Sequence, residues 1–309
     1  ALTEEAQTMA TKPKAAKKTR RAPKRRARKR GSSLGTASHR AVAVATSPRR
    51  SVKERTAAAA DAPLAVCESE QDFQAMLKVL RDADEPVKVR LAALQSLQAA
   101  SFSVLAFEGS RGDYIATLRQ VAEDRDPELR QRVLGMLMRE KDGFAQKKLL
   151  EGLHDPDKAL VPPEKALQLL GNDVHADAYE VARAIVRKPP NEAARREALR
   201  LLGADATAAP LFEKLLLDKD ELREIRQIAA SALYALQPDR MQKHARDILL
   251  DKSDYDDIKA TSLSALTQLD DKTLSEDKAL MKSVDRFSTG KTTPRYKQTA
   301  RRFLSKYGR

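Results

Sequence analysis

Residues whose types and spacing could support chemistry are sparse in this chain of 309 amino acids. The four histidines are His39, His154, His175 and His244. None of them has the neighbours of an HExxH or other metal-binding motif. The single cysteine, Cys67, has no second thiol for a disulfide, which is typical of a protein from a reducing compartment. We therefore expect no metal and no cofactor.

One glycine-containing segment, residues 288–293 (STGKTT), imitates the end of a phosphate-binding P-loop. The first glycine of that motif would fall at Asp285, and no predicted strand precedes the segment. Because the loop needs both features to wrap around a phosphate, the sequence predicts no nucleotide site and no enzymatic activity.

The strongest chemical signal is positive charge, which is concentrated at one end of the chain. Residues 1–60 hold 17 Lys and Arg and three acids, a net charge of 17 − 3 = +14, so the remaining residues sum to zero. Residues 12–30 alone hold 12 Lys and Arg, no acid and no large apolar side chain. Such a composition cannot bury enough surface to offset the entropy of ordering, so we expect residues 1–62 to form a disordered polycationic arm.

Phosphate backbones are the ligand that best fits this arm, because each neutralised phosphate releases condensed counterions. The candidate nucleic-acid-binding residues of the arm are Lys12, Lys14, Lys17, Lys18, Arg20, Arg21, Lys24, Arg25, Arg26, Arg28, Lys29, Arg30, Arg49 and Arg50. Residues 14–24 (KAAKKTRRAPK) resemble the Lys, Ala and Pro-rich tails of histones, and residues 47–50 (SPRR) resemble minor-groove-binding units of histone tails. The other interpretations are a nuclear localisation signal, an anionic membrane surface or a solubilising tail.

The rest of the chain, residues 63–309, is a helical repeat. An apolar residue, a basic residue, two free positions, two small or aliphatic residues, two free positions and a leucine recur, with intervals of 40, 33, 32, 31 and 33 residues between the basic positions. The copies start at Val89, Leu129, Pro162, Ala194, Ile225 and Ile258, with a further copy at Tyr296. Each copy follows another segment with apolar residues at helical spacing. This period is typical of an α-solenoid, here of six to seven helix pairs.

The turns between paired helices carry a family resemblance. Residues 124–130 (DRDPELR) resemble the signature of the HEAT repeat, including the HEAT-like repeats of phycobilin lyases. The resemblance implies an all-α fold and a structural ladder of hydrogen bonds between repeats. The ladder residues it implies are Asp84, Arg90, Asp124, Arg130, Asp220 and Arg226. Pro162-Pro163 and Pro189 depart from the pattern, and we expect a shifted or shortened helix at both places.

A second basic region closes the sequence as a C-terminal cap, residues 288–309. From Arg286 to Arg309 there are eight Lys and Arg and no acid. On the last expected helix, one face would carry the candidate phosphate contacts Arg295, Arg302, Lys306 and Arg309. Tyr296 and Phe303 are expected to point away from it.

These features favour a non-catalytic, nucleic-acid-associated scaffold whose arm binds DNA or RNA and whose solenoid groove binds a protein partner. One alternative is a pure protein adaptor whose arm is a localisation signal. Another is a HEAT-like DNA glycosylase, although the chain has no Trp with which to build an aromatic cage. No run approaches the roughly 18 apolar residues of a membrane helix, so we expect an intracellular protein, nuclear in a eukaryote or in the cytoplasm or nucleoid of a bacterium.

Overall fold

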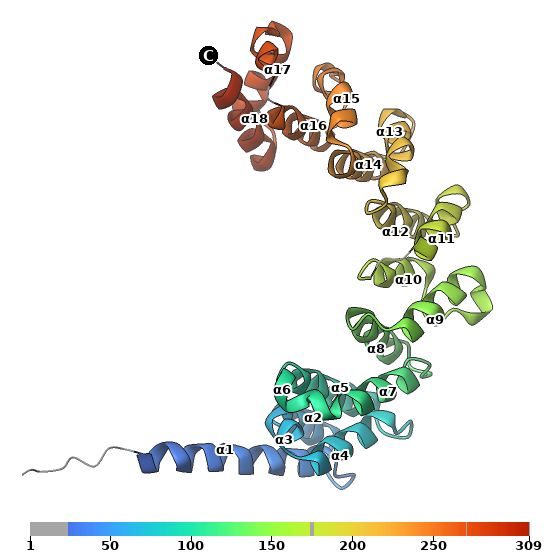
Figure 1. Ribbon diagram of the computed structural model, residues 1–309, viewed down its shortest axis with the longest axis vertical. Coiled ribbons are helices and arrows are strands. Elements are labelled where there is room, and N and C mark those ends of the chain that lie inside the picture. Colours follow the sequence, from blue (N-terminus) through green and yellow to red (C-terminus); the bar gives the residue numbers. More distant parts are fainter. Residues whose placement is uncertain (1–23, 174–175, 270, 309) are drawn as a thin grey trace, which may run out of the picture. The chain divides into compact units, whose positions relative to one another are not determined.

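Helices follow one another through the whole part of the chain that the computed structural model describes, residues 24–173, 176–269 and 271–308, with side chains from residue 35 onward. No strand occurs in these ranges. The chain divides into two units, residues 1–110 and 111–309 (Figure 1). The predicted all-α, HEAT-like solenoid is confirmed, with seven helix pairs among the described residues.

Unit 1 holds the first helix pair and four helices that the repeat pattern did not predict. Its helices are α1 (Lys24–Ala45), α2 (Val52–Ala60), α3 (Pro63–Glu68), α4 (Glu70–Arg81), α5 (Val87–Ser101) and α6 (Val104–Phe107). The pair is α4 and α5, and its apolar stripes meet in a core that includes Phe73, Leu77 and Leu94.

The prediction that residues 1–62 are disordered is wrong for the second half of this arm. Residues 24–45 and 52–60 are helical, and residues 1–23 lie outside the described part of the chain. Ser38 joins these helices to α3, because its hydroxyl donates to the Asp61 carbonyl over 2.8 Å and accepts from the Ala65 amide over 3.0 Å. The Arg55 guanidinium donates to the Ala45 carbonyl and to both Glu85 oxygens, at 2.7 to 2.9 Å. These hydrogen bonds and the buried small apolar residues of α1 and α2 stabilise the two helices. The prediction of disorder, which rested on charge, did not take them into account.

Replacing Arg55 with alanine should therefore release α1 and α2 from α4 and α5. The change leaves the half-buried Glu85 carboxylate without its cation, and we expect a loss of about 3 kcal/mol in unfolding free energy, at the lower end of the range for buried pairs. Urea denaturation followed by circular dichroism measures it. Arg50→Ala is the control, since its ion pair with Glu54 is exposed and should contribute under about 1 kcal/mol. Equal effects of the two changes would contradict the docking of α2.

Unit 2 holds six helix pairs. They are α7 (Arg111–Val121) with α8 (Pro127–Arg139), α9 (Gly143–His154) with α10 (Pro163–Leu170), α11 (Ala176–Arg187) with α12 (Glu192–Leu202), α13 (Ala209–Leu217) with α14 (Arg223–Leu236), α15 (Pro238–Leu250) with α16 (Asp256–Gln268), and α17 (Lys278–Thr289) with α18 (Pro294–Tyr307). From α10 on, each second helix packs on the second helix of the next pair. Each pair therefore buries its stripe against its neighbours, as a solenoid requires.

Helix starts follow the turn chemistry of the sequence. Asp126 caps α8 by accepting the Leu129 amide over 2.9 Å, and Pro127 occupies the first turn, where a missing N–H costs nothing. At Pro162-Pro163 the expected shortening is confirmed, because α10 has only eight residues. The last pair buries Tyr296 and Phe303 as expected.

Candidate functional site

Three buried arginines bridge successive helices by the same contact. The Nε of Arg55, Arg90 and Arg226 donates to the carbonyl ten residues earlier, at Ala45, Leu80 and Leu216, over 2.9 to 3.0 Å. These carbonyls lie in the last turn of the preceding helix, where no backbone amide is left to donate to them. Each arginine therefore lies in one helix and caps the C-terminus of the helix before it.

The second half of this ladder uses different acids from those predicted. Arg55, Arg195 and Arg226 donate both terminal nitrogens to carboxylates of the following repeat, those of Glu85, Glu221 and Asp254 respectively. These acids lie five residues before the next basic position, whereas the expected ladder acids lie six before it. The register of the acids is therefore corrected by one residue.

The predicted ladder acids occupy the turn in another way. Asp84 and Asp220 are exposed, and their amides donate to Asp82 and Asp218 over 3.0 Å. The Asp124 carboxylate accepts the Asp126 amide over 2.9 Å. Arg130 donates to backbone carbonyls, those of Asp124 and Leu160 among them, at 2.8 and 2.9 Å. The three acids shape their own turns, whereas Arg130 also reaches the segment that precedes α10 through Leu160. The ladder is a structural feature.

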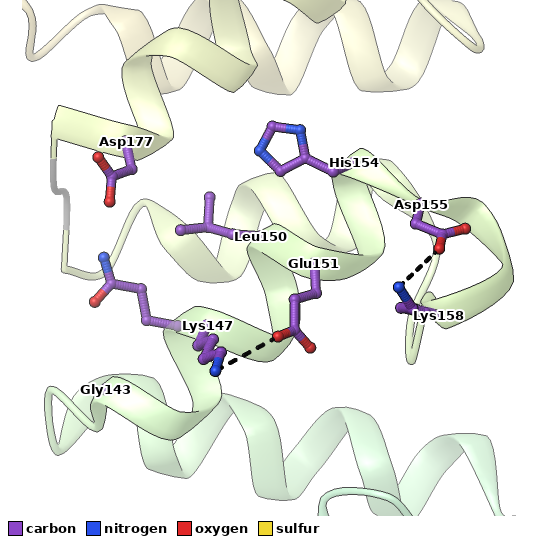
Figure 2. Close-up of a pocket in the computed structure, with 9 residues that line it drawn as sticks. Gly143, Lys147, Leu150, Glu151, His154, Asp155, Lys158 and Asp177 are labelled. Atoms are coloured by element: carbon purple, nitrogen blue, oxygen red, sulfur yellow. Dashed lines mark ion pairs between the residues drawn. The ribbon is translucent and has the colours of Figure 1, made fainter.

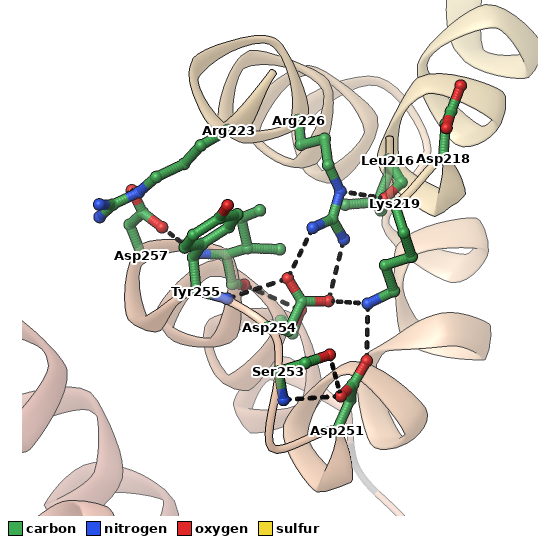
Figure 3. A network of polar contacts seen from close by, with 12 residues as sticks. Leu216, Asp218, Lys219, Arg223, Arg226, Asp251, Ser253, Asp254, Tyr255 and Asp257 are labelled. Atoms are coloured by element: carbon green, nitrogen blue, oxygen red, sulfur yellow. Dashed lines mark hydrogen bonds and ion pairs between the residues drawn. The ribbon is translucent and has the colours of Figure 1, made fainter. Parts of the chain in front are cut away.

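The best-developed rung is a buried charge network between α14 and the turn before α16. Figure 3 shows Arg226 and Lys219 converging on Asp254, with both Arg226–Asp254 contacts at 2.9 Å and the Lys219 contact at 2.5 Å. The Arg226 side chain is 2% exposed and that of Asp254 is 0% exposed. Burial opposes charge on Asp254, but the hydrogen bonds from Arg226 and Lys219 outweigh it and lower its pKa. Hydrogen bonds from Lys219 and Ser253 likewise lower the pKa of Asp251.

Acid should therefore destabilise the fold. The pKa values of Asp254, Asp251 and Glu221 are lowered in the folded chain, Glu221 chiefly by its hydrogen bond from Arg195, so these groups stabilise the fold fully only above their unfolded pKa values of about 4. We expect the unfolding free energy to stay level from about pH 7 to pH 5 and to fall below about pH 4 as the folded carboxylates take up protons. Thermal unfolding over this range measures it. Asp254→Asn is the control and should lose less on acidification; an unchanged acid profile would contradict the assignment.

An apolar groove opens in unit 2 where the repeat pattern breaks. It has a volume of about 1230 Å³ and lies between α9, the turn after it, and α11. Apolar lining comes from Leu153, Val181, Ala184 and Ile185. Prolines border it, namely Pro156, Pro163, Pro189 and Pro190. Two of them, Pro163 and Pro189, belong to the departures from the repeat noted in the sequence.

The rim of this groove is basic. Arg187 and Lys188 are exposed and form no ion pair within the described residues, while Arg183 is held by Asp205 and by the Thr207 hydroxyl. Glu180 is the acidic residue of the lining. The groove can accept an apolar segment that carries negative charge.

A smaller polar hollow of about 400 Å³ adjoins the groove and shares His154 with it. Figure 2 shows His154 and Asp177 facing this hollow from α9 and α11. Its ion pairs are Lys158–Asp155 at 3.0 Å and Lys147–Glu151 at 3.9 Å (Figure 2). No cluster of three His, Cys, Asp or Glu side chains that could hold a metal occurs among the residues that the structure describes.

The predicted cationic residues that the structure describes lie on separate elements. Seven others lie outside the described residues, namely Lys12, Lys14, Lys17, Lys18, Arg20, Arg21 and Arg309. Six belong to α1, namely Lys24, Arg25, Arg26, Arg28, Lys29 and Arg30. Arg49 and Arg50 are exposed between α1 and α2, and Arg295 and Arg302 are exposed on α18.

Lys306 has a structural role that the sequence did not reveal. Its ammonium donates to the carbonyls of Thr267 and Leu269 at the end of α16, over 3.1 and 2.6 Å. A cation at a helix C-terminus satisfies free carbonyls and opposes the helix dipole. Lys306 therefore acts as a helix cap, and its role as a phosphate contact stays a prediction.

Comparison with known proteins gives a limited result. No protein-family model matches the sequence, and no curated protein is similar to it. Among the solved structures that it matches is the complex of CpcE and CpcF of phycocyanin lyase from Nostoc sp. PCC7120, at 16% identity and a TM-score of 0.39, over 96% of this chain and 99% of that one. That complex is described as a phycocyanin lyase, and the prediction of no enzymatic activity is withdrawn. No described helix is long and apolar enough to cross a membrane.

Proposed function

We propose that this protein is a nucleic-acid-associated scaffold, in which residues 12–30 bind phosphates and the apolar groove of unit 2 binds a protein. The observation that carries the first part is the run of 12 Lys and Arg in residues 12–30 without one acid. A polycation of this density gains free energy from counterion release on any phosphate backbone, whatever its sequence.

The folded part of the chain supports this proposal by giving the polycation an attachment. Residues 24–30, which hold six of the 12 cations, belong to α1, and the other end of α1 is fixed by Ser38. A nucleic acid bound there would be linked to unit 1 through a helix.

The protein-binding part rests on the groove itself. Grooves that are apolar at the centre and charged at the rim are typical of surfaces that hold a peptide or a helix. Its position in the irregular repeats makes it a feature of this chain and not of solenoids in general.

The test is a fluorescence-anisotropy titration of a short DNA duplex and an RNA hairpin with the full chain. The variant replaces all 12 cations of residues 12–30 with glutamine, which preserves helix propensity in α1. A matched control replaces the exposed Arg295, Arg301 and Arg302 of α18 with glutamine. Deleting residues 1–60 would be a poor test, since it removes Ser38 and Arg55 and so disturbs unit 1. Binding that is lost only in the first variant supports the proposal; binding that survives it overturns the role of residues 12–30.

A further inference from the structure

An exposed apolar knob lies on unit 1, formed by Phe102, Val104 and Leu105. Their exposed fractions are 78%, 61% and 97%. Large side chains this exposed, three within four residues, mark interaction surfaces. The knob has no occupant within the described residues and plays no part in the proposed function.

The local fold explains why these side chains project. Helix α5 ends at Ser101, and α6 spans only four residues. Of this segment, Phe107 is buried and meets the Phe73 ring edge to face, with the ring centres 5.6 Å apart. Phe107 thus anchors the turn in the core of unit 1, and the residues before it are held out from the surface.

The knob and the groove of unit 2 are complementary in polarity and charge. The knob consists of exposed apolar side chains, and the groove has an apolar lining and a volume of about 1230 Å³. Glu108, which is exposed and has no ion pair among the described residues, borders the knob. Arg187 and Lys188, exposed and likewise without ion pairs there, border the groove. Opposite charges at the two rims would favour docking and fix its orientation.

We propose that the chain self-associates head to tail, with the knob of one copy seated in the groove of the next. The occupant of the groove is then a second copy of this chain. The inference rests on the protein-binding part of the proposed function and is independent of the nucleic-acid part. Because knob and groove are different surfaces, the contact is heterologous, and each copy keeps one free knob or groove after the first contact forms. Association should therefore continue beyond the dimer as concentration rises.

Two complementary variants of the full chain test this arrangement. Leu105→Asp places a charge on the knob, and Ala184→Arg fills the groove with a bulky cation. Both positions are exposed, so neither change removes a core contact. Leu222→Asp is the control, because Leu222 is also an exposed leucine but belongs to neither surface and precedes α14.

Sedimentation velocity over a range of concentrations gives the outcome. We expect the wild type and Leu222→Asp to form dimers and larger species, and each of the two variants alone to associate at least about tenfold more weakly, a change of roughly 1.4 kcal/mol. An equimolar mixture of Leu105→Asp and Ala184→Arg should associate again but stop at the dimer, since that pair has one intact knob and one intact groove. A wild type that is monomeric throughout, or a mixture that stays monomeric, overturns the proposal.

Charge reversal separates this contact from general hydrophobic association. Glu108→Lys should weaken association, and adding Lys188→Glu in the same chain should restore at least part of it. Loss without recovery in the double variant would overturn the rim pairing. Nucleic-acid affinity measured at chain concentrations below the onset of association should be unchanged in all of these variants, so a failure of self-association and a failure of phosphate binding are distinguishable.

Discussion

Replacing Asp254 with alanine is expected to lower the free energy of unfolding by about 3 to 5 kcal/mol. Arg226 would keep its bond to the Leu216 carbonyl, but its two terminal nitrogens would be left in a site where the side chain is 2% exposed. Lys219 would lose one of its two carboxylates. The cost is that of a buried charge without its counterion, which exceeds the net contribution of the intact pair.

Urea denaturation followed by circular dichroism measures this effect, and Arg223→Ala is its control. Arg223 pairs with Asp257 in the adjacent turn at 3.0 Å, but its side chain is exposed, so its removal should cost under about 1 kcal/mol. If both changes cost the same, burial does not set the strength of the ladder. A further variant, Arg226→Met with Asp254→Leu, should regain much of the loss, because it removes both charges together.

The helix pairs could be predicted because the repeat pattern recurs at nearly regular intervals along the sequence. Apolar residues at helical spacing, together with Asp-Pro turns such as Asp126-Pro127, predicted the position of the second helix of each pair in residues 63–309. The arginines of the ladder were predicted for the same reason, since Arg90 and Arg226 occupy the same position in their repeats. Helix positions and ladder arginines that recur at a regular interval can be identified from the sequence alone.

The sequence could not show which of two neighbouring acids binds the ladder arginine. Asp84 and Glu85 are neighbours in one turn, and the backbone angles there decide which carboxylate reaches back to Arg55. Spacing along the sequence contains no such angles. The capping role of Lys306 was missed for a related reason, because it depends on where α16 ends in space.

The second half of the arm and the groove were missed for different reasons. Charge dominates the composition of residues 1–60 and hid a few small apolar positions, among them Ala41, Val42 and Ala45, that are buried in the structure. The groove had a signal, Pro162-Pro163 and Pro189, which predicted a shifted or shortened helix. The sequence did not show that the disturbance leaves an open apolar volume.

The affinity for nucleic acid should depend steeply on salt. If about half of the 12 cations in residues 12–30 contact phosphates, the logarithm of the association constant should fall with the logarithm of the salt concentration with a slope of about −5, since each contact contributes about −0.9 on duplex DNA. Between about 50 and 200 mM salt, affinity should then drop by roughly a thousandfold. DNA sequence should have little effect, because phosphate contacts carry no base information.

The most direct test of the scaffold proposal is this salt slope, measured by anisotropy on the full chain and on the variant with all 12 cations of residues 12–30 changed to glutamine. We expect the wild type to show the steep slope and the variant to retain a slope near zero, with circular dichroism unchanged. A variant that binds as tightly, and with the same slope, as the wild type would show that the phosphate contacts lie elsewhere and would contradict the account.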